Sequence, residues 1–143
     1  KTIIKPVRHI YHGDIAKQGL PFYSGAVTYK ADISFTPGDR VFVSLPDFEA
    51  AVVKVSANGA EPKAIAWQPY EAEITDMLKA GQNTLRIEYV LTRRNTFGPL
   101  HSKPARHGAY GPETFLLRGD SWTDDYIFLP EGMTAVPEII IKN

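Results

Sequence analysis

Apolar and polar residues alternate with a period of two in four stretches of the first 90 residues, a period typical of strands with one buried face. Residues 29–35 place Tyr, Ala, Ile and Phe alternately with Lys, Asp and Ser. Residues 41–45, 52–57 and 85–89 follow the same rule, the last with Leu85, Ile87 and Tyr89. The pattern therefore predicts four half-buried strands in this part of the chain.

Turn-forming residues separate these predicted strands. Asn58-Gly59 follows the third strand, and because both residues tolerate positive φ the pair predicts a tight hairpin turn. Thr75 is predicted to cap a single helical turn that Gly81 ends. Residues 14–19 contain a capping residue and a stop glycine, which predict one or two further helical turns.

The second part of the chain is less regular. Residues 92–112 are rich in Gly, Pro, His and Arg and show no sustained period, which predicts a long surface loop of the kind that often carries function. Residues 114–118, 126–129 and 138–142 are the last strand candidates. Eight or nine short strands with almost no helix predict an all-β fold, an antiparallel β-sandwich with jelly-roll topology preferred over an immunoglobulin-like one.

Composition narrows the class of protein further. The 143 residues suit one domain, and the 16 basic and 16 acidic residues balance, so no broad positive field favours nucleic acid as a partner. Cysteine is absent, which excludes disulfides and thiolate metal sites. No apolar run approaches the length of a membrane-spanning helix. The start lacks an initiator Met and a signal-peptide core, so we expect residues 1–143 to be one domain of a larger protein.

Several of these motifs together resemble the sugar-binding domain of family 2 glycoside hydrolases, which has a galactose-binding-like jelly-roll fold. The resemblance covers residues 25–91, and its strongest element is the stretch from Ile74 to Leu85, with Trp67 and Pro69-Tyr70-Glu71 before it. The tail, with residues 94–101, 111–113 and 122–126, resembles the ancillary β-sandwich of large bacterial polysaccharide-degrading proteins. These resemblances imply a non-catalytic module that binds carbohydrate or braces a neighbouring catalytic domain, in an extracellular, periplasmic or cell-surface protein.

Carbohydrate binding requires flat aromatic faces and planar polar groups, and the chain offers both. Trp67 is expected to pack over the core beside Pro69 and Tyr70, with a sugar platform as the less favoured alternative, whereas recognition and packing are equally open for Trp122. The remaining candidates lie in the late loops. The complete set of predicted ligand-binding residues is Trp122, Tyr110, Arg94, His101, Glu113, Asp124 and Trp67.

Charge is distributed unevenly in spite of the neutral total. Residues 89–112 contain Arg93, Arg94, Lys103 and Arg106 but no acid, whereas residues 113–138 contain six acids and one arginine. The favoured explanation is that these two segments pair with each other or are separately solvated. The alternative is that the basic segment binds an acidic sugar such as a uronate through guanidinium contacts.

No cofactor is predicted, although Asp124-Asp125 with Glu113 leave a structural calcium as an alternative. Adjacent acids on an extended segment point in opposite directions, and no EF-hand loop is present, which both disfavour this site. Glu113 with Asp124 or Asp125 could supply the two carboxylates of a glycosidase, but the chain contains no catalytic motif, and we expect no independent enzyme activity.

Overall fold

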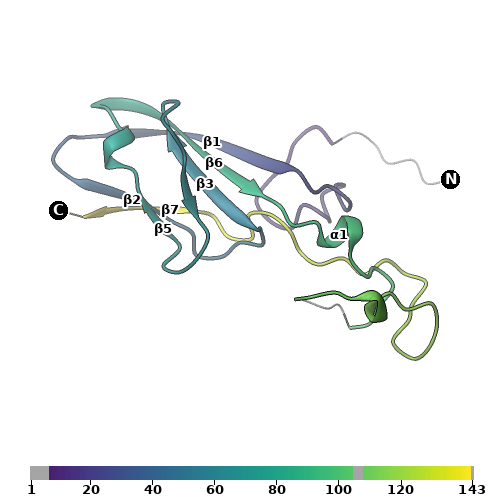
Figure 1. The fold of residues 1–143 in the computed structure, drawn as a ribbon. Helices are drawn as coiled ribbons and strands as arrows, with labels where there is room; N and C mark the ends of the chain where they lie inside the picture. The colour runs from purple at the N-terminus through teal and green to yellow at the C-terminus, as the bar shows by residue number, and fades with distance from the viewer. Residues whose placement is uncertain (1–6, 105–107, 143) are drawn as a thin grey trace.

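The computed structural model describes residues 7–104 and 108–142, which form two antiparallel sheets packed face to face (Figure 1). The first sheet contains, in spatial order, β1 (Ala26–Phe35), β6 (Gly81–Val90), β3 (Val52–Ala57) and β4 (Lys63–Ile65). The second contains β5 (Glu71–Glu73), β2 (Arg40–Ser44) and β7 (Glu138–Lys142). All strand pairs are antiparallel, so the predicted all-β antiparallel sandwich is confirmed.

Helix is limited to three short elements in the part of the chain that the structure describes. These are the 3-10 turns η1 (Thr75–Met77) and η2 (Pro112–Thr114) and the four-residue helix α1 (Arg94–Phe97). Residues 15–19 form a hydrogen-bonded turn in place of the helical turns predicted there. No helix among the described residues is long and apolar enough to cross a membrane.

Strand β6 is the central element of the larger sheet. It pairs along its whole length with β1 and along its second half with β3. On its inner face Leu85, Ile87 and Tyr89 are at most 6% exposed, and Tyr89 packs edge-on against the Tyr29 and Phe48 rings. The predicted alternation therefore decides which face of β6 enters the core.

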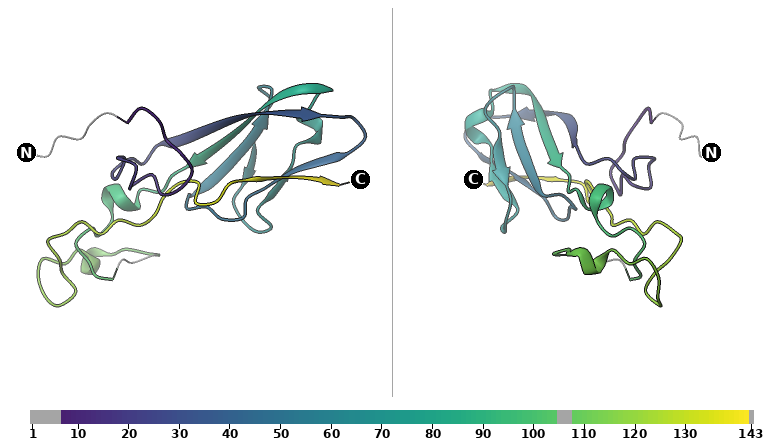
Figure 2. Two further views of the ribbon diagram at one scale, coloured as in Figure 1. Left: turned by 180° about the vertical axis from the view of Figure 1, so that it is seen from behind. Right: turned by 45° about the vertical axis from the view of Figure 1, so that its right-hand side comes forward.

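Two of the predicted strands do not form, and the described residues contain seven strands instead of eight or nine. Residues 114–118 begin in η2 and continue mostly as bends, and residues 126–129 form no regular secondary structure and are not part of a sheet. Both segments lie in the loops that project beyond the end of the sandwich (Figures 1 and 2). Among the described residues, neither segment pairs with a strand of either sheet, so an alternating pattern there has no partner.

The Asn58-Gly59 turn forms as predicted, with positive φ at both residues, and it is held by a buried amide. Asn83 accepts hydrogen bonds from Lys79 N and the Asn58 amide, and it donates to the carbonyls of Lys79 and Gly81. Asn58 also donates from its side chain to Met77 O. One network thus fixes the turn after β3 and the turn before β6.

The predicted cap at Thr75 is wrong. η1 covers Thr75–Met77, but no side chain caps it. The Thr75 hydroxyl instead accepts a hydrogen bond from Val41 N and donates one to Glu73. Gly81 does not end the helical turn, because it already belongs to β6 with a φ of 85°.

The long connections gather at one end of the sandwich, where β1, β3, β5 and β7 begin and β2, β4 and β6 end. The connections at this end include residues 45–51, 66–70, 91–104 and 108–137, and Figure 2 shows the last two ranges projecting away from the sheets. All seven predicted site residues lie in these connections, so the topology brings them to the same end.

Replacing the buried amide of Asn83 tests how strongly the two turns depend on it. Asn83→Ala leaves two backbone carbonyls and the Lys79 N–H without their partner, and each unsatisfied group costs about 1–3 kcal/mol when buried. Because all three hydrogen bonds are only part-buried, water can replace Asn83 in part, and we expect a loss of about 2–4 kcal/mol in the free energy of unfolding, measured by urea denaturation. Gln82→Ala, on the exposed face, should change it by less than about 0.5 kcal/mol; an equal loss in both variants would contradict this role of Asn83.

The Arg40–Glu73 pair predicts acid sensitivity. Arg40 donates two hydrogen bonds to Glu73, of 3.1 and 2.6 Å, and lowers the pKa of Glu73 from 4.5 to about 2. Because the folded-state pKa is depressed, this stabilisation is complete above pH 4.5 and is lost as pH falls towards 2. Glu73→Gln should therefore be less stable than wild type at pH 7, with the difference narrowing in acid, as measured by urea denaturation. A difference independent of pH, or an equal effect of the exposed-site control Glu61→Gln, would contradict this.

Candidate functional site

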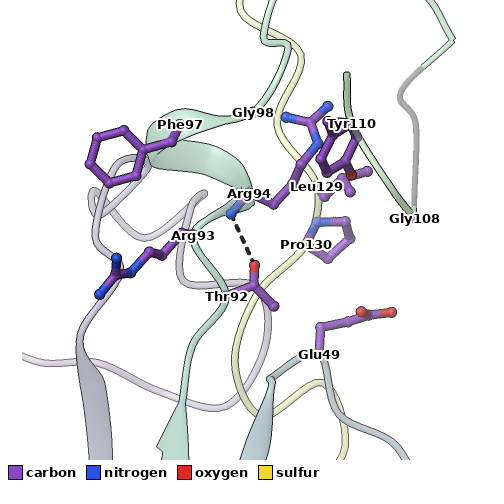
Figure 3. Close-up of a pocket in the computed structure, with 10 residues that line it drawn as sticks. All are labelled: Glu49, Thr92, Arg93, Arg94, Phe97, Gly98, Gly108, Tyr110, Leu129 and Pro130. Atoms are coloured by element: carbon purple, nitrogen blue, oxygen red, sulfur yellow. Dashed lines mark hydrogen bonds between the residues drawn. The ribbon is translucent and has the colours of Figure 1, made fainter. Parts of the chain in front are cut away.

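A pocket of about 460 Å³ lies beside α1 at the end of the sandwich where the long connections gather (Figure 3). Its walls come from four separate segments of the chain. The lining residues are Glu49, Thr92, Arg93, Arg94, Phe97, Gly98, Gly108, Tyr110, Leu129 and Pro130. Two predicted ligand residues, Arg94 and Tyr110, are therefore brought together in one pocket.

The end of β6 determines where the pocket forms. Leu91 continues the buried face of the strand, and its N–H donates to Gly25 O. Thr92 follows and makes two contacts: its hydroxyl donates to the Glu131 carboxylate and accepts a hydrogen bond of 3.2 Å from Arg94 N. The second bond holds the first residue of α1 against the strand end, as Figure 3 shows.

Arg94 and Arg93 have different roles in the pocket wall. Arg94 is only 7% exposed, donates from its guanidinium to Pro99 O and lies 5.1 Å from the centre of the Tyr110 ring. Gly98 permits this arrangement, because a Cβ there would lie 2.5 Å from Arg94 O and 2.7 Å from its side chain. Arg94 thus fixes the loop and orients Tyr110, whereas the exposed Arg93 supplies accessible positive charge.

Asn95 ties α1 to the opposite wall of the pocket. Its amide donates to Leu129 O over 2.7 Å and accepts from Leu129 N over 2.9 Å. Asn95 is 1% exposed and Leu129 is 8% exposed, so both hydrogen bonds are shielded from water. A single buried side chain therefore holds the two walls in register.

Glu131 is a buried acid behind the pocket, 2% exposed. The Glu131 backbone connects the segment that follows Leu129 to the turn at residues 15–19. Ile15 N donates to Glu131 O, and Glu131 N donates to the Asp14 carboxylate. Burial raises the pKa of the Glu131 carboxyl, and the hydrogen bond from Thr92 opposes this shift only in part. Within the described ranges, Oε2 of this carboxyl has no hydrogen-bond partner.

His101 and Trp122 form a second cluster, away from the pocket lining. Lys103 N donates to Ser121 O, and Thr123 N donates to His101 O, so the two segments pair side by side. The His101 ring stacks on Trp122 with 6.2 Å between ring centres and contacts Tyr126 at 4.9 Å. Since a carbonyl only accepts, the contact from His101 Nδ1 to Thr123 O places the proton on Nδ1.

The other predicted ligand residues lie outside both groups. Glu113 and Asp124 are exposed, and the carboxylate of Glu113 folds back over Gly111. Trp67 lies in the connection between β4 and β5 and is 80% exposed, so the expectation that it packs over the core is wrong. Phe48 takes that position instead and contacts Tyr70 with 4.9 Å between ring centres.

The basic and acidic segments meet inside the molecule, where the Thr92 hydroxyl donates to the Glu131 carboxylate. Burial raises the pKa of Glu131, and the positive charge of Arg94 opposes this rise in part. Arg106 and His107 lie outside the described residues. Across residues 7–104 and 108–142, no group of three His, Asp or Glu side chains is placed to hold a metal ion. Glu113, Asp124 and Asp125 accordingly do not form such a group.

Sequence reasoning missed several pocket residues. Glu49 enters the pocket because its backbone forms an isolated antiparallel bridge with Gly132. Phe97 and Leu129 enter because Asn95 holds their segments together. The signal that could have located this wall is the run Thr92-Arg93-Arg94-Asn95 directly after a buried strand, since polar residues at a strand end gather in the end loops of a sandwich.

No protein-family model matches this chain, and the curated proteins contain no significant match. The class that the fold defines is the antiparallel two-sheet β-sandwich. Among solved structures, the rhamnosidase from Novosphingobium sp. PP1Y contains a similar arrangement, with a TM-score of 0.60 and 22% sequence identity. The similarity covers 87% of this chain and 12% of that rhamnosidase, so it shows the fold, and this chain spans only a small part of the length of that protein.

The match bears on the fold of this chain. A β-sandwich resembling part of a glycoside hydrolase is confirmed, whereas the relation to the sugar-binding domain of family 2 enzymes stays a prediction.

The buried acid predicts a dependence of stability on pH. Because the folded-state pKa of Glu131 is raised, stability is highest in acid and falls as pH rises above the ordinary value of 4.5 towards the raised pKa. Glu131→Gln lacks this ionisation, so its stability relative to wild type should increase with pH, as measured by urea unfolding between about pH 4 and 8. The exposed control Glu113→Gln should follow wild type. A Glu131→Gln curve parallel to that of wild type would contradict the shift.

Proposed function

We propose that this chain is a non-catalytic, carbohydrate-associated module of a larger glycoside hydrolase-like protein, and that the pocket beside α1 is its saccharide site. The match to 12% of a rhamnosidase supports the accessory role. The proposal that the pocket binds saccharide rests on the side chains that line it. An exported location, extracellular, periplasmic or at the cell surface, belongs to the same proposal.

The pocket combines the two kinds of group that sugar recognition uses. Phe97 is 68% exposed, and Leu129 and Pro130 add apolar surface for the C–H face of a pyranose ring. Arg93 and Glu49, both exposed, supply charged donors and acceptors for hydroxyl groups. The volume of about 460 Å³ falls within the range of small-molecule sites, about 300–1,000 Å³.

The positive charge of Arg93 bears on the class of sugar. An exposed guanidinium favours an acidic sugar, such as a uronate, that it binds through two hydrogen bonds. Glu49, which also lines the pocket, favours neutral hydroxyl-rich sugars, because its carboxylate accepts hydrogen bonds from hydroxyl groups and repels an acidic sugar. A panel for binding should therefore pair rhamnose-containing and other neutral glycans with uronate-containing ones, at low and high salt.

A second function, bracing a neighbouring catalytic domain without binding glycan, is favoured by a different observation. Exposed apolar side chains gather in the same end loops: Phe97, Phe115 and Tyr126 are 68%, 50% and 56% exposed, and Leu117 is 90% exposed. Exposed apolar groups of this kind typically mark contact surfaces with other proteins.

Two phenylalanines distinguish these functions, because only one of them lines the pocket. Phe97→Ala should weaken glycan binding by about tenfold or more, whereas Phe115→Ala should leave it unchanged, measured by titration calorimetry on the glycan panel. Arg93→Ala should weaken binding of acidic glycans in particular, with the exposed Arg118→Ala as its matched control.

Absence of glycan binding by the folded chain would contradict the saccharide site. If Phe97→Ala and Phe115→Ala then both weaken binding to the separately expressed remainder of the parent protein, the bracing function replaces it. Glycan binding could also persist in both Phe97→Ala and Arg93→Ala but be lost in Trp67→Ala or Trp122→Ala. In that case the saccharide site would lie at those tryptophans and not beside α1.

A further inference from the structure

Strand β7 forms an open edge of the smaller sheet. It pairs with β2 on one side, and among the described residues its other side has no strand partner. Its sequence, Glu138-Ile-Ile-Ile-Lys142, is apolar in the middle and carries opposite charges at its two ends. Edges of this kind are usually protected by charge, proline or a covering element, because their free backbone groups pair readily with another strand.

The hydrogen bonds of β2 show which backbone groups of β7 face the open side. Val41 N donates to Thr75 Oγ1 and Val41 O accepts from Ile74 N, so Val41 directs both groups away from β7. Backbone direction alternates along an antiparallel strand, so Arg40, Phe42 and Ser44 face β7. Their partners are Lys142, Ile140 and Glu138, which leaves the N–H and C=O groups of Ile139 and Ile141 on the open edge.

The side chains of Ile139 and Ile141 are also incompletely covered. They lie opposite Val43 and Val41, which are 0% and 2% exposed, yet they are themselves 39% and 59% exposed. Two grooves of about 280 and 120 Å³ run past Ile139, and both also contact Ile33 of β1. The core is therefore open along the side of the sandwich between β1 and β7.

We propose that this edge pairs with β7 of a second copy of the chain, in antiparallel orientation about a two-fold axis at Ile140. In this register Ile139 lies opposite Ile141 of the other copy, and their free N–H and C=O groups exchange hydrogen bonds. Ile140 lies opposite itself. Glu138 of each copy lies opposite Lys142 of the other, so the strand is complementary to itself in charge as well as in backbone pattern.

The pairing would join the two smaller sheets into one continuous sheet of six strands, since each contributes three. It would also bring the partly exposed Ile139 and Ile141 side chains of the two copies together on the inner face. No β7 residue lines the pocket beside α1, so the dimer leaves that pocket accessible.

Charge reversal gives the sharpest test. Glu138→Lys places two lysines opposite each other at both ends of the interface, and Lys142→Glu places two glutamates there. Each variant alone should dissociate about tenfold more readily than wild type in sedimentation equilibrium. Mixing the two variants restores both opposite-charge pairs, so a heterodimer of wild-type affinity should form.

The mixture also controls for effects within one copy. Lys142 contacts Glu71 over 3.6 Å and lies 4.2 Å from the Phe42 ring, so Lys142→Glu changes the monomer as well. Damage to the monomer would persist in the mixture, whereas a lost intermolecular pair would be recovered. Thermal melting of each variant at low protein concentration verifies that it is folded.

The absence of cysteine permits a second, independent test. Ile140→Cys places two thiols at a non-hydrogen-bonded pair, where Cα atoms lie about 4.5 Å apart, within the range of about 4.4–6.8 Å that a disulfide requires. The Ile140→Cys variant should form a disulfide-linked dimer quickly on mild oxidation. Ala64→Cys, exposed on the edge strand β4 of the other sheet, should not.

The proposal is overturned if the wild-type chain stays monomeric in a concentration series up to about 1 mM. It is equally overturned if a dimer forms but Glu138→Lys leaves its affinity unchanged, or if Ile140→Cys crosslinks no faster than Ala64→Cys.

Discussion

The period-two burial along β6 is the constraint on which the rest of the structure depends. Leu85, Ile87, Tyr89 and Leu91 all point into the core, and β6 simultaneously pairs with β1 and β3. A shift of one residue would expose every one of these side chains and break both pairings. Because the same strand ends at Val90, two residues before Thr92, its register also sets where α1 starts and therefore where the pocket lies.

The sequence was sufficient to predict the sandwich, because alternation, turn chemistry and burial act over a few residues. The strands around residues 29–35, 41–45, 52–57 and 85–89 form where the alternation placed them. In the edge strand β1, Tyr29, Ile33 and Phe35 are partly buried, whereas Ala31 is exposed. Prediction failed where a strand pattern had no partner, as at residues 114–118 and 126–129, since pairing depends on distant parts of the chain.

The candidate site could be predicted only in part, for a related reason. Charged and aromatic composition identified Arg94 and Tyr110, which do meet, but composition does not show which side chains point outward. Arg94 braces the loop from a buried position, whereas Trp67, expected to be buried, is 80% exposed. The long-range contacts that decide this, between Asn95 and Leu129 and between Glu49 and Gly132, leave no local pattern in the sequence.

The sandwich and the pocket walls are therefore stabilised by different interactions, and this difference bears on both proposals. The sandwich is stabilised by apolar burial, which tolerates substitutions of similar volume. The pocket walls are held by polar contacts of Thr92 and of the buried Asn95 and Glu131, each of which needs one particular partner. The open edge at β7 belongs to the apolar sandwich and lies apart from those contacts. Self-association through β7 and ligand binding beside α1 thus draw on separate interactions, so a change that abolishes one should leave the other intact.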